Sequence, residues 1–201
     1  MTPKHQYFYA VGLSYKKADA EIRGSFSLDT KAKTQVLEQA QREGIESLIV
    51  TSTCNRTEIY GFAEHPFQLI KLICQFSNGT VEDFQKVGYV YKNQEAVNHL
   101  FRVGTGLDSQ ILGDFEIISQ IKAGFNESKA MKLVNTYMDR LINAVIQASK
   151  KIKTDTEISS GATSVSFASV RYIFENVENI SSKKSTIYSS NLLFHQLPKE
   201  Y

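Results

Sequence analysis

The first ninety residues alternate between short apolar runs and longer amphipathic segments. Two of the longer segments predict helices: 30–43, where apolar residues recur on one face and Gly44 follows as a stop signal, and 66–76, which a proline opens. The short runs are rich in β-branched and aromatic residues and predict four strands, at 7–13, 45–53, 57–63 and 88–91. The resulting order is the βαββαβ order of ferredoxin-like folds. We therefore expect an α+β domain with an open sheet and helices on one face.

From Asn93 onward the pattern becomes helical. Apolar residues recur at steps of three and four and form one continuous seam, made of Val134, Met138, Leu141, Val145, Ala148 and Ile152. Such a seam supports packing within one chain or coiled-coil pairing, and its short length favours packing within the chain. A further helix is predicted to begin at Thr163 or Ser164 and to run to Ile173 or beyond. This part of the chain is therefore predicted to be a helical subdomain.

Composition narrows the class of protein. With 201 residues, 42% hydrophobic and 22% charged, the chain suits a soluble globular protein of one domain or little more. A formal charge of +2 gives no overall field for a polyanionic partner. No apolar run is long enough to cross a membrane and the N-terminus lacks a signal peptide, so the cytoplasm is the expected compartment.

The cysteines and histidines limit the chemistry. Two cysteines are too few for a disulfide framework, and both are expected to be reduced. The four histidines are scattered without the spacing of metal ligands, so no metal is expected and a metal-dependent hydrolase has little support. Cys74 lies in an apolar helical segment and is expected to be a core residue. Cys54 differs, because it lies between two predicted strands and a cation, Arg56, follows two residues later.

Three blocks of sequence resemble one enzyme family. Ser-Thr-Cys-Asn-Arg-Thr-Glu-Ile-Tyr at 52–60 resembles the signature of glutamyl-tRNA reductase. His-Leu-Phe-Arg-Val at 99–103, followed by Gly-Leu-Asp-Ser at 106–109, resembles the family's helical stretch with its active-site histidine and substrate-facing serine. A third block covers 153–158 and 161–166. The blocks follow the family order at about the family spacing, and the resemblance extends over roughly residues 6 to 184.

The resemblance implies a reaction at Cys54. In the family's mechanism the corresponding cysteine attacks the α-carbonyl of glutamate esterified to tRNA, expels the tRNA and holds glutamate as a thioester. NADPH then reduces the thioester to glutamate-1-semialdehyde, at the start of tetrapyrrole (porphyrin) biosynthesis. A thiolate is a strong nucleophile, and a thioester accepts hydride better than the original ester does. His99 is the implied general base or leaving-group acid, since an imidazole can both accept and donate a proton near neutral pH.

Further residues are implied in substrate binding. Arg56 is either a surface cation or a bidentate clamp for the glutamate carboxylate, and the resemblance favours the clamp. Thr53 and Ser109 are expected to hydrogen-bond the substrate and Asn55 to orient the loop, although such residue types commonly serve turns and caps.

Two positions depart from the family pattern. Asp114 and Glu116 stand where the family usually has glutamate and glutamine. Asp114 keeps a carboxylate on a shorter arm. Glu116 adds a negative charge, which would oppose binding of glutamate if it faced the substrate.

The resemblance also implies a division of the chain. No glycine follows Gly161, so the glycine-rich turn of a dinucleotide-binding domain is not expected, and neither is the family's dimerisation domain. NADPH is thus the cofactor of the full-length family, and this chain alone is expected to stop at thioester formation and ester hydrolysis. The expected parts are a sheet subdomain at 1–92, a helical subdomain at 93–160, the start of a connecting helix at 161–180 and a divergent tail at 181–201.

Partners follow from the same resemblance. Glutamyl-tRNA is the implied substrate, glutamate-1-semialdehyde aminomutase is the candidate protein partner, and no membrane is expected. The oligomeric state stays open, with a monomer or weak dimer favoured. The competing hypothesis is a non-catalytic module that binds tRNA or a pathway partner, for which Lys150, Lys151 and Lys153 could contact phosphates, although they also complement a helix dipole.

Overall fold

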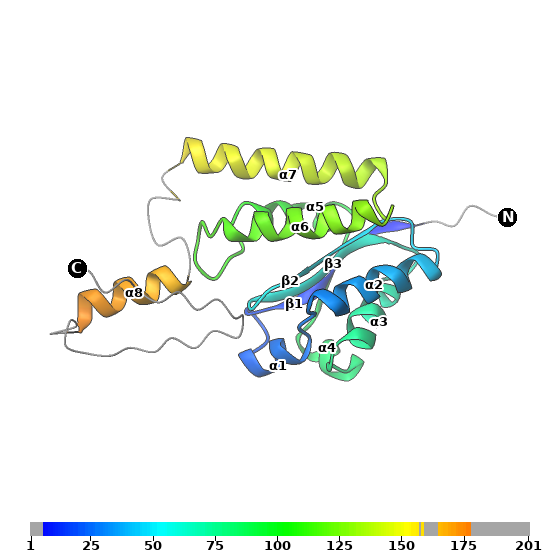
Figure 1. Ribbon diagram of the computed structural model, residues 1–201, viewed down its shortest axis with the longest axis horizontal. Helices are drawn as coiled ribbons and strands as arrows, with labels where there is room; N and C mark the ends of the chain where they lie inside the picture. The colour runs from blue at the N-terminus through cyan, green and yellow to red at the C-terminus, as the bar shows by residue number, and fades with distance from the viewer. Residues whose placement is uncertain (1–5, 157, 159–164, 178–201) are drawn as a thin grey trace.

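A four-stranded antiparallel sheet lies at the centre of the molecule (Figure 1). The computed structural model describes residues 6–156, 158 and 165–177. Each predicted strand is present, and the strand order in space is β2-β3-β1-β4. The strands are β1 (Tyr7–Ser14), β2 (Leu48–Ser52), β3 (Arg56–Ala63) and β4 (Tyr89–Lys92). Because Ser14 pairs with Arg56, the end of β1 lies beside the start of β3.

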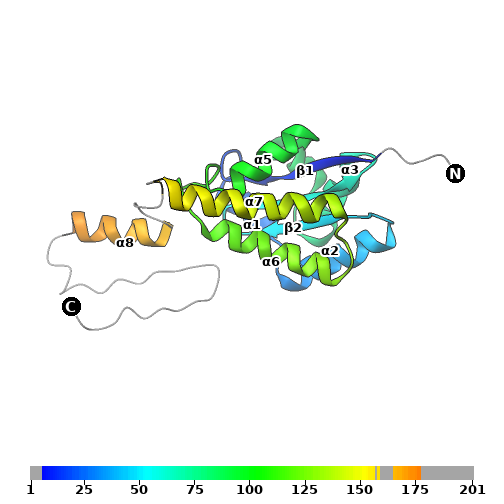
Figure 2. The same ribbon diagram turned by 90° about the horizontal axis from the view of Figure 1, so that it is seen from above.

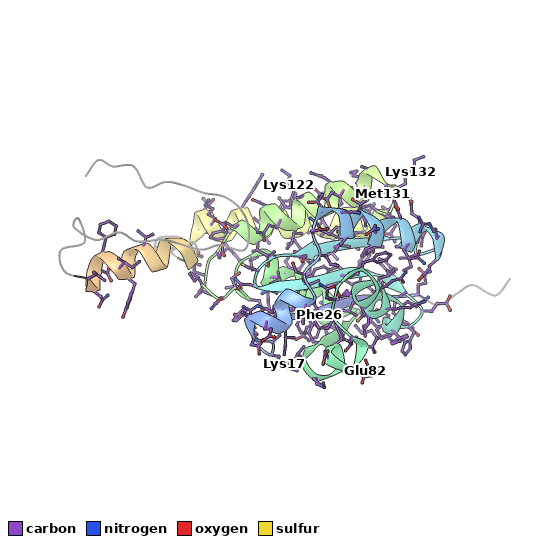
Figure 3. The ribbon with its side chains drawn as sticks, turned by 60° about the horizontal axis from the view of Figure 1, so that its bottom comes forward. Lys17, Phe26, Glu82, Lys122, Met131 and Lys132 are labelled. Carbon is purple, nitrogen blue, oxygen red and sulfur yellow. The ribbon has the colours of Figure 1, made fainter. Side chains whose placement is uncertain are left out.

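Helices connect and cover the strands. They are α1 (Ala20–Ser25), α2 (Thr30–Arg42), α3 (Pro66–Phe76), α4 (Val81–Val87), α5 (Gln94–Gly104), α6 (Glu116–Ala130), α7 (Thr136–Asp155) and α8 (Val165–Asn176). Local signals begin several of them: Asp19 and Asp29 accept hydrogen bonds from backbone amides in the first turns of α1 and α2, and His65 with Pro66 opens α3. The short helices α1 and α4 pack through Phe26, labelled in Figure 3, whose ring centroid lies 6.0 Å from that of Phe84.

The sheet carries helices on both faces, which differs from the one-sided arrangement that the strand and helix order predicts. Helices α2 and α3 cover one face, while α5 and α6 contact the strands on the other (Figures 1 and 2). Alternate residues of β1 divide accordingly, since Val11 and Leu13 join the first core and Phe8 and Ala10 join the second. The helical segment after Asn93 is therefore the second covering layer of the sheet.

The apolar seam of α7 packs inside the chain. Its buried residues Met138, Leu141 and Val145 belong to the same core as Leu100 of α5 and Ile121 of α6. Packing within the chain, which the seam's length favours, thus accounts for these positions.

The end of the chain is described only in part. The predicted helix after residue 160 is seen as α8, whereas its proposed caps at 163 and 164 and the divergent tail at 181–201 lie outside the described residues. None of the helices in the described ranges combines the length and apolarity that crossing a bilayer requires.

Candidate active site

Cys54 is exposed in the turn that joins β2 to β3, and we call residues 53–56 the cysteine turn. The Thr53 amide donates to the Arg56 carbonyl at 2.8 Å and closes the turn. The Thr53 hydroxyl accepts from the amides of Asn55 and Arg56 at 3.1 and 3.2 Å. Threonine commonly supports turns in this way. The Thr53 oxygen expected to bind substrate therefore holds the turn that presents the thiol.

The segment after β1 supports the cysteine turn from one side. The Tyr15 amide donates to the Asn55 carbonyl at 2.9 Å. Arg23 of α1 donates through Nε to the Cys54 carbonyl at 3.0 Å and through Nη1 to the Ala18 carbonyl at 2.6 Å. Two neighbouring carbonyls of the turn are thus held by donors from a different part of the chain.

A largely buried charged cluster lies next to the turn, with the exposed Lys16 at its edge. We call it the Glu58 network, and its members are Lys16, Arg56, Glu58, Tyr60, Tyr89, His99 and Asp108. Glu58 is 0% exposed and lies at its centre. Its carboxylate accepts from Arg56 Nη1 at 3.1 Å, from the Tyr60 hydroxyl at 2.7 Å and from the Tyr89 hydroxyl. It also contacts His99 Nε2 at 2.7 Å. A buried carboxylate with this many donors remains charged at low free-energy cost.

Arg56 connects Glu58 to the loop between α5 and α6. Its Nη2 donates to the Asp108 carbonyl oxygen and lies 3.2 Å from Asp108 Oδ1. Lys16 donates to the other carboxylate oxygen of Asp108. Arg56 is therefore not a surface cation, and in this conformation its guanidinium holds two acidic residues of its own chain.

Burial and charge act in opposite directions on the acids of the network. Burial would raise the pKa of Glu58, but the Arg56 charge and the hydrogen bond from His99 outweigh it and lower the pKa to about 2. Asp108 follows the same balance, its pKa lowered by Lys16 and Arg56 against the effect of burial. Burial and the Glu58 charge raise the pKa of Tyr60 and Tyr89 well above the ordinary tyrosine value. Glu58 is thus ionised and both tyrosines are neutral donors at neutral pH.

His99 is 7% exposed and surrounded by aromatic rings. Its ring centroid lies 4.6 Å from that of Tyr91 and 5.2 Å from that of Tyr89. Because an ionised carboxylate only accepts hydrogen bonds, Nε2 carries the proton towards Glu58, which in the neutral ring leaves Nδ1 as the acceptor. In the part of the chain that the structure describes, the side chain that His99 hydrogen-bonds is Glu58 and not Cys54.

The remaining predicted residues lie in the loop between α5 and α6. Ser109 is half-buried and directly follows Asp108, so it is brought near Arg56. Asp114 is half-buried, and its Oδ1 accepts from the Glu116 amide at 2.9 Å at the start of α6. Glu116 itself is exposed in the first turn of that helix. Asp114 therefore supports a helix start, which explains why a short acidic side chain suits this position.

The structure brings some predicted residues together and adds others. Cys54, Arg56 and Ser109 gather at one end of the sheet, and His99 joins them through Glu58. Glu58 is a site residue that the sequence motifs alone do not indicate. The strand alternation holds the signal, because residues 56, 58 and 60 share one face of β3. Within residues 6–156, 158 and 165–177, no three His, Cys, Asp or Glu side chains are grouped to hold a metal ion.

Comparison with known proteins points to one family. The family described as "Glutamyl-tRNAGlu reductase, N-terminal domain" matches residues 11–156. The chain is 73% identical over 188 residues to a glutamyl-tRNA reductase of Flavobacterium psychrophilum, covering 94% of this chain and 46% of that protein. It is 33% identical over 162 residues to one of Acinetobacter baumannii, covering 80% and 38%.

A solved structure agrees with these matches. The chain superposes on glutamyl-tRNA reductase from Methanopyrus kandleri with a TM-score of 0.67 and 25% identity, over 84% of this chain and 39% of that one. The chain spans less than half the length of the curated relatives it matches.

Proposed function

Since the chain belongs to the glutamyl-tRNA reductase family, we propose that it binds glutamyl-tRNA and accepts the glutamyl group on Cys54. The Cys54 sulfur bonds to the α-carbonyl carbon of glutamate, the ester bond to the ribose breaks, and the ribose oxygen leaves with a proton. An aminoacyl ester is reactive enough for attack by a thiolate. The observation that carries the proposal is the exposed thiol in a turn whose backbone is held by hydrogen bonds.

Arg56 is proposed as the residue that selects the glutamate side chain. A guanidinium binds a carboxylate in bidentate fashion, which favours glutamate over glutamine. Asp108 holds this guanidinium in the present conformation, so a substrate carboxylate must replace the carboxylate of Asp108 or bind beside it. Ser109, which follows Asp108, is proposed to contribute a hydroxyl to the same carboxylate.

His99 is proposed to handle the proton. Glu58 fixes the Nε2 side of the ring, so Nδ1 is the atom that would take the thiol proton or return it to the ribose oxygen. The rings of Tyr89 and Tyr91 pack against the imidazole and keep it oriented.

NADPH, which the family resemblance implies, does not fit the described residues. Pyrophosphate binding in that class of domain uses a glycine-rich turn from a strand into a helix. In the described ranges the closest glycine pair, Gly104 and Gly106, lies at the C-terminal end of the helix α5 and not in a turn from a strand into a helix. We therefore assign acyl transfer to this part of the chain, and the reduction that would give glutamate-1-semialdehyde for tetrapyrrole synthesis remains a proposal for the whole protein.

Intact-protein mass spectrometry after mixing with glutamyl-tRNA, without NADPH, tests the acyl transfer. A glutamyl adduct is expected on the parent and on the matched Cys74→Ser variant, and none on Cys54→Ser. Deacylation of the tRNA should disappear with the same substitution. If the folded parent binds tRNA but forms no adduct and releases no glutamate, the proposal fails in favour of a binding module.

A further inference from the structure

The backbone of the cysteine turn has an uneven distribution of hydrogen bonds. The amides of Thr53, Asn55 and Arg56 each have an acceptor, and the carbonyls of Cys54 and Asn55 each have a donor. Among the hydrogen bonds of the described residues, none uses the Cys54 amide. The turn is therefore fixed on both sides of one amide, which belongs to the nucleophile itself.

Arg23 supplies the contact from outside the turn. Asp19 caps α1 by accepting from the Ile22 amide at 2.8 Å, and the Arg23 amide donates to the Asp19 carbonyl at 3.0 Å. The Arg23 side chain is thus fixed at its base, and its planar guanidinium bridges the carbonyls of Ala18 and Cys54. Two nitrogens of one rigid group make this bridge, which the single nitrogen of a lysine cannot reproduce.

We propose that Arg23 is a positioning residue that holds the Cys54 carbonyl so that the Cys54 amide N–H binds the oxyanion formed during acyl transfer. The inference rests on the proposed function. As Sγ bonds to the carbonyl carbon, an electron pair moves onto the carbonyl oxygen. That pair returns when the bond to the ribose oxygen breaks. The amide and the thiol belong to one residue, so the amide lies beside the carbon under attack, and a donor fixed in advance needs no reorganisation.

The size of the effect follows from known oxyanion sites. Removing one donor of such a site lowers kcat by about 10²–10³, and a small misplacement of reacting groups can reduce the rate by about 10². Arg23→Ala loosens the donor without removing it. We therefore expect the maximal rate of deacylation to fall by about tenfold to a hundredfold.

Single-turnover deacylation of glutamyl-tRNA over a range of protein concentrations separates positioning from binding. For Arg23→Ala the maximal rate should fall, while the half-saturating concentration stays within about twofold of the parent. Arg23→Lys should recover part of the rate, because one nitrogen can still reach the Cys54 carbonyl. Lys17→Ala is the matched control, since Lys17 is an exposed cation near α1 (Figure 3) and should leave both parameters unchanged.

A second measurement needs no tRNA. A glutamate-derived aldehyde adds the Cys54 sulfur to its carbonyl carbon, and the resulting hemithioacetal oxygen occupies the oxyanion position. Its affinity is read from protection of Cys54 against iodoacetamide, with Cys74 as the internal reference. Arg23→Ala should lower the affinity for the aldehyde by about tenfold. The affinity for the corresponding alcohol, which cannot form the adduct, should stay unchanged.

The outcomes separate the inference from the proposed function. A folded parent that neither deacylates tRNA nor is protected by the aldehyde overturns both. Equal rates and equal aldehyde affinity in parent and Arg23→Ala overturn the positioning role and leave the proposed function standing. A raised half-saturating concentration at an unchanged maximal rate also overturns it, because Arg23 would then contact tRNA. Circular dichroism of both Arg23 variants confirms that folded proteins are compared.

Discussion

The two faces of the central sheet are both buried but are stabilised in different ways. On the face covered by α2 and α3 the strands present apolar side chains, such as Val11, Leu13 and Ile59. On the other face an apolar core gives way, towards the cysteine turn, to charged residues paired in the Glu58 network. Dispersion and the hydrophobic effect are insensitive to pH, whereas ion pairs are not. Alternate residues of strand β3 therefore stabilise the fold differently: those on one face through hydrophobic packing, and those on the other face through ion pairs.

The largest expected loss of stability comes from a substitution at the centre of the Glu58 network, which lies on the charged face of the sheet. Glu58→Gln leaves Arg56 without one of its two acidic partners. It also replaces one of the two carboxylate oxygens that accept from the two tyrosines and His99 with an amide group that only donates. Removing one member of a buried ion pair typically costs about 3–5 kcal/mol. Urea unfolding at neutral pH measures the loss, and Glu82→Gln, on the exposed surface of α4, is the matched control. Equal unfolding midpoints for the two variants would contradict a central role of Glu58.

Acid should weaken the charged face alone. The pKa of Glu58 is about 2 in the folded protein against 4.5 for a free side chain. Its contribution is therefore complete above about pH 5 and is lost as pH falls towards 2, and it amounts to about 3 kcal/mol. Asp108 acts in the same direction. Urea midpoints at several pH values should show this loss in the parent and a smaller loss in Glu58→Gln; parallel curves would argue against it.

Gly12 tests how closely β1 approaches the network. An added Cβ at this position would lie 2.4 Å from the Thr57 carbonyl oxygen and 2.8 Å from Cγ of Glu58. Backbone must shift to relieve this contact, and overpacking of this kind costs about 1–3 kcal/mol. Gly24→Ala in α1 is the control, because nothing lies within 4 Å of its added Cβ. Thermal unfolding should therefore give a lower melting temperature for the Gly12 variant than for Gly24→Ala. Similar melting temperatures would show that the close approach of β1 to β3 does not require a glycine at position 12.

The smallest expected effect is on the apolar face. Ile59→Val removes one methylene from the core and should lower the free energy of unfolding by about 1 kcal/mol. The loss should be the same at pH 7 and pH 3, since no charged group is involved. A loss that changes with pH by as much as that of Glu58→Gln would show that the two faces are not independent.

Local sequence patterns are sufficient to predict most strands and helices, but they do not reveal the long-range contacts between those elements. The strands and the helices α2, α3 and α7 follow from periodicity and caps. The order of neighbouring elements does not predict that the second face of the sheet is covered. The helices that cover this face come from a part of the chain that is distant in sequence from most of the strands. The unbroken apolar run 48–50 held that signal, since it lacks the polar positions of a solvated face.

The candidate site shows the same limit. Cys54 and Arg56 stand out from their own segment, but the partner of Arg56 at position 108 lies 52 residues away along the chain. Nothing in the spacing of Thr53 indicates that its hydroxyl would be used by neighbouring amides. Burial of Arg56 and the central position of Glu58 depend on the packing of α5 against β1 and β4, which only the folded chain contains.

Alternation along β3 has a consequence for folding accuracy. Arg56 and Glu58 point to one face of the sheet and Thr57 and Ile59 to the other. Across the hairpin, Thr57 pairs with Ser52 of β2 and Glu58 pairs with Thr51. A hairpin formed one residue out of step would place the Glu58 carboxylate in the apolar core and Ile59 among the charges. Such a misfolded form loses both the ion pairs and the hydrophobic contacts at once. The residues proposed for chemistry thus also discriminate against wrong pairing while the sheet assembles.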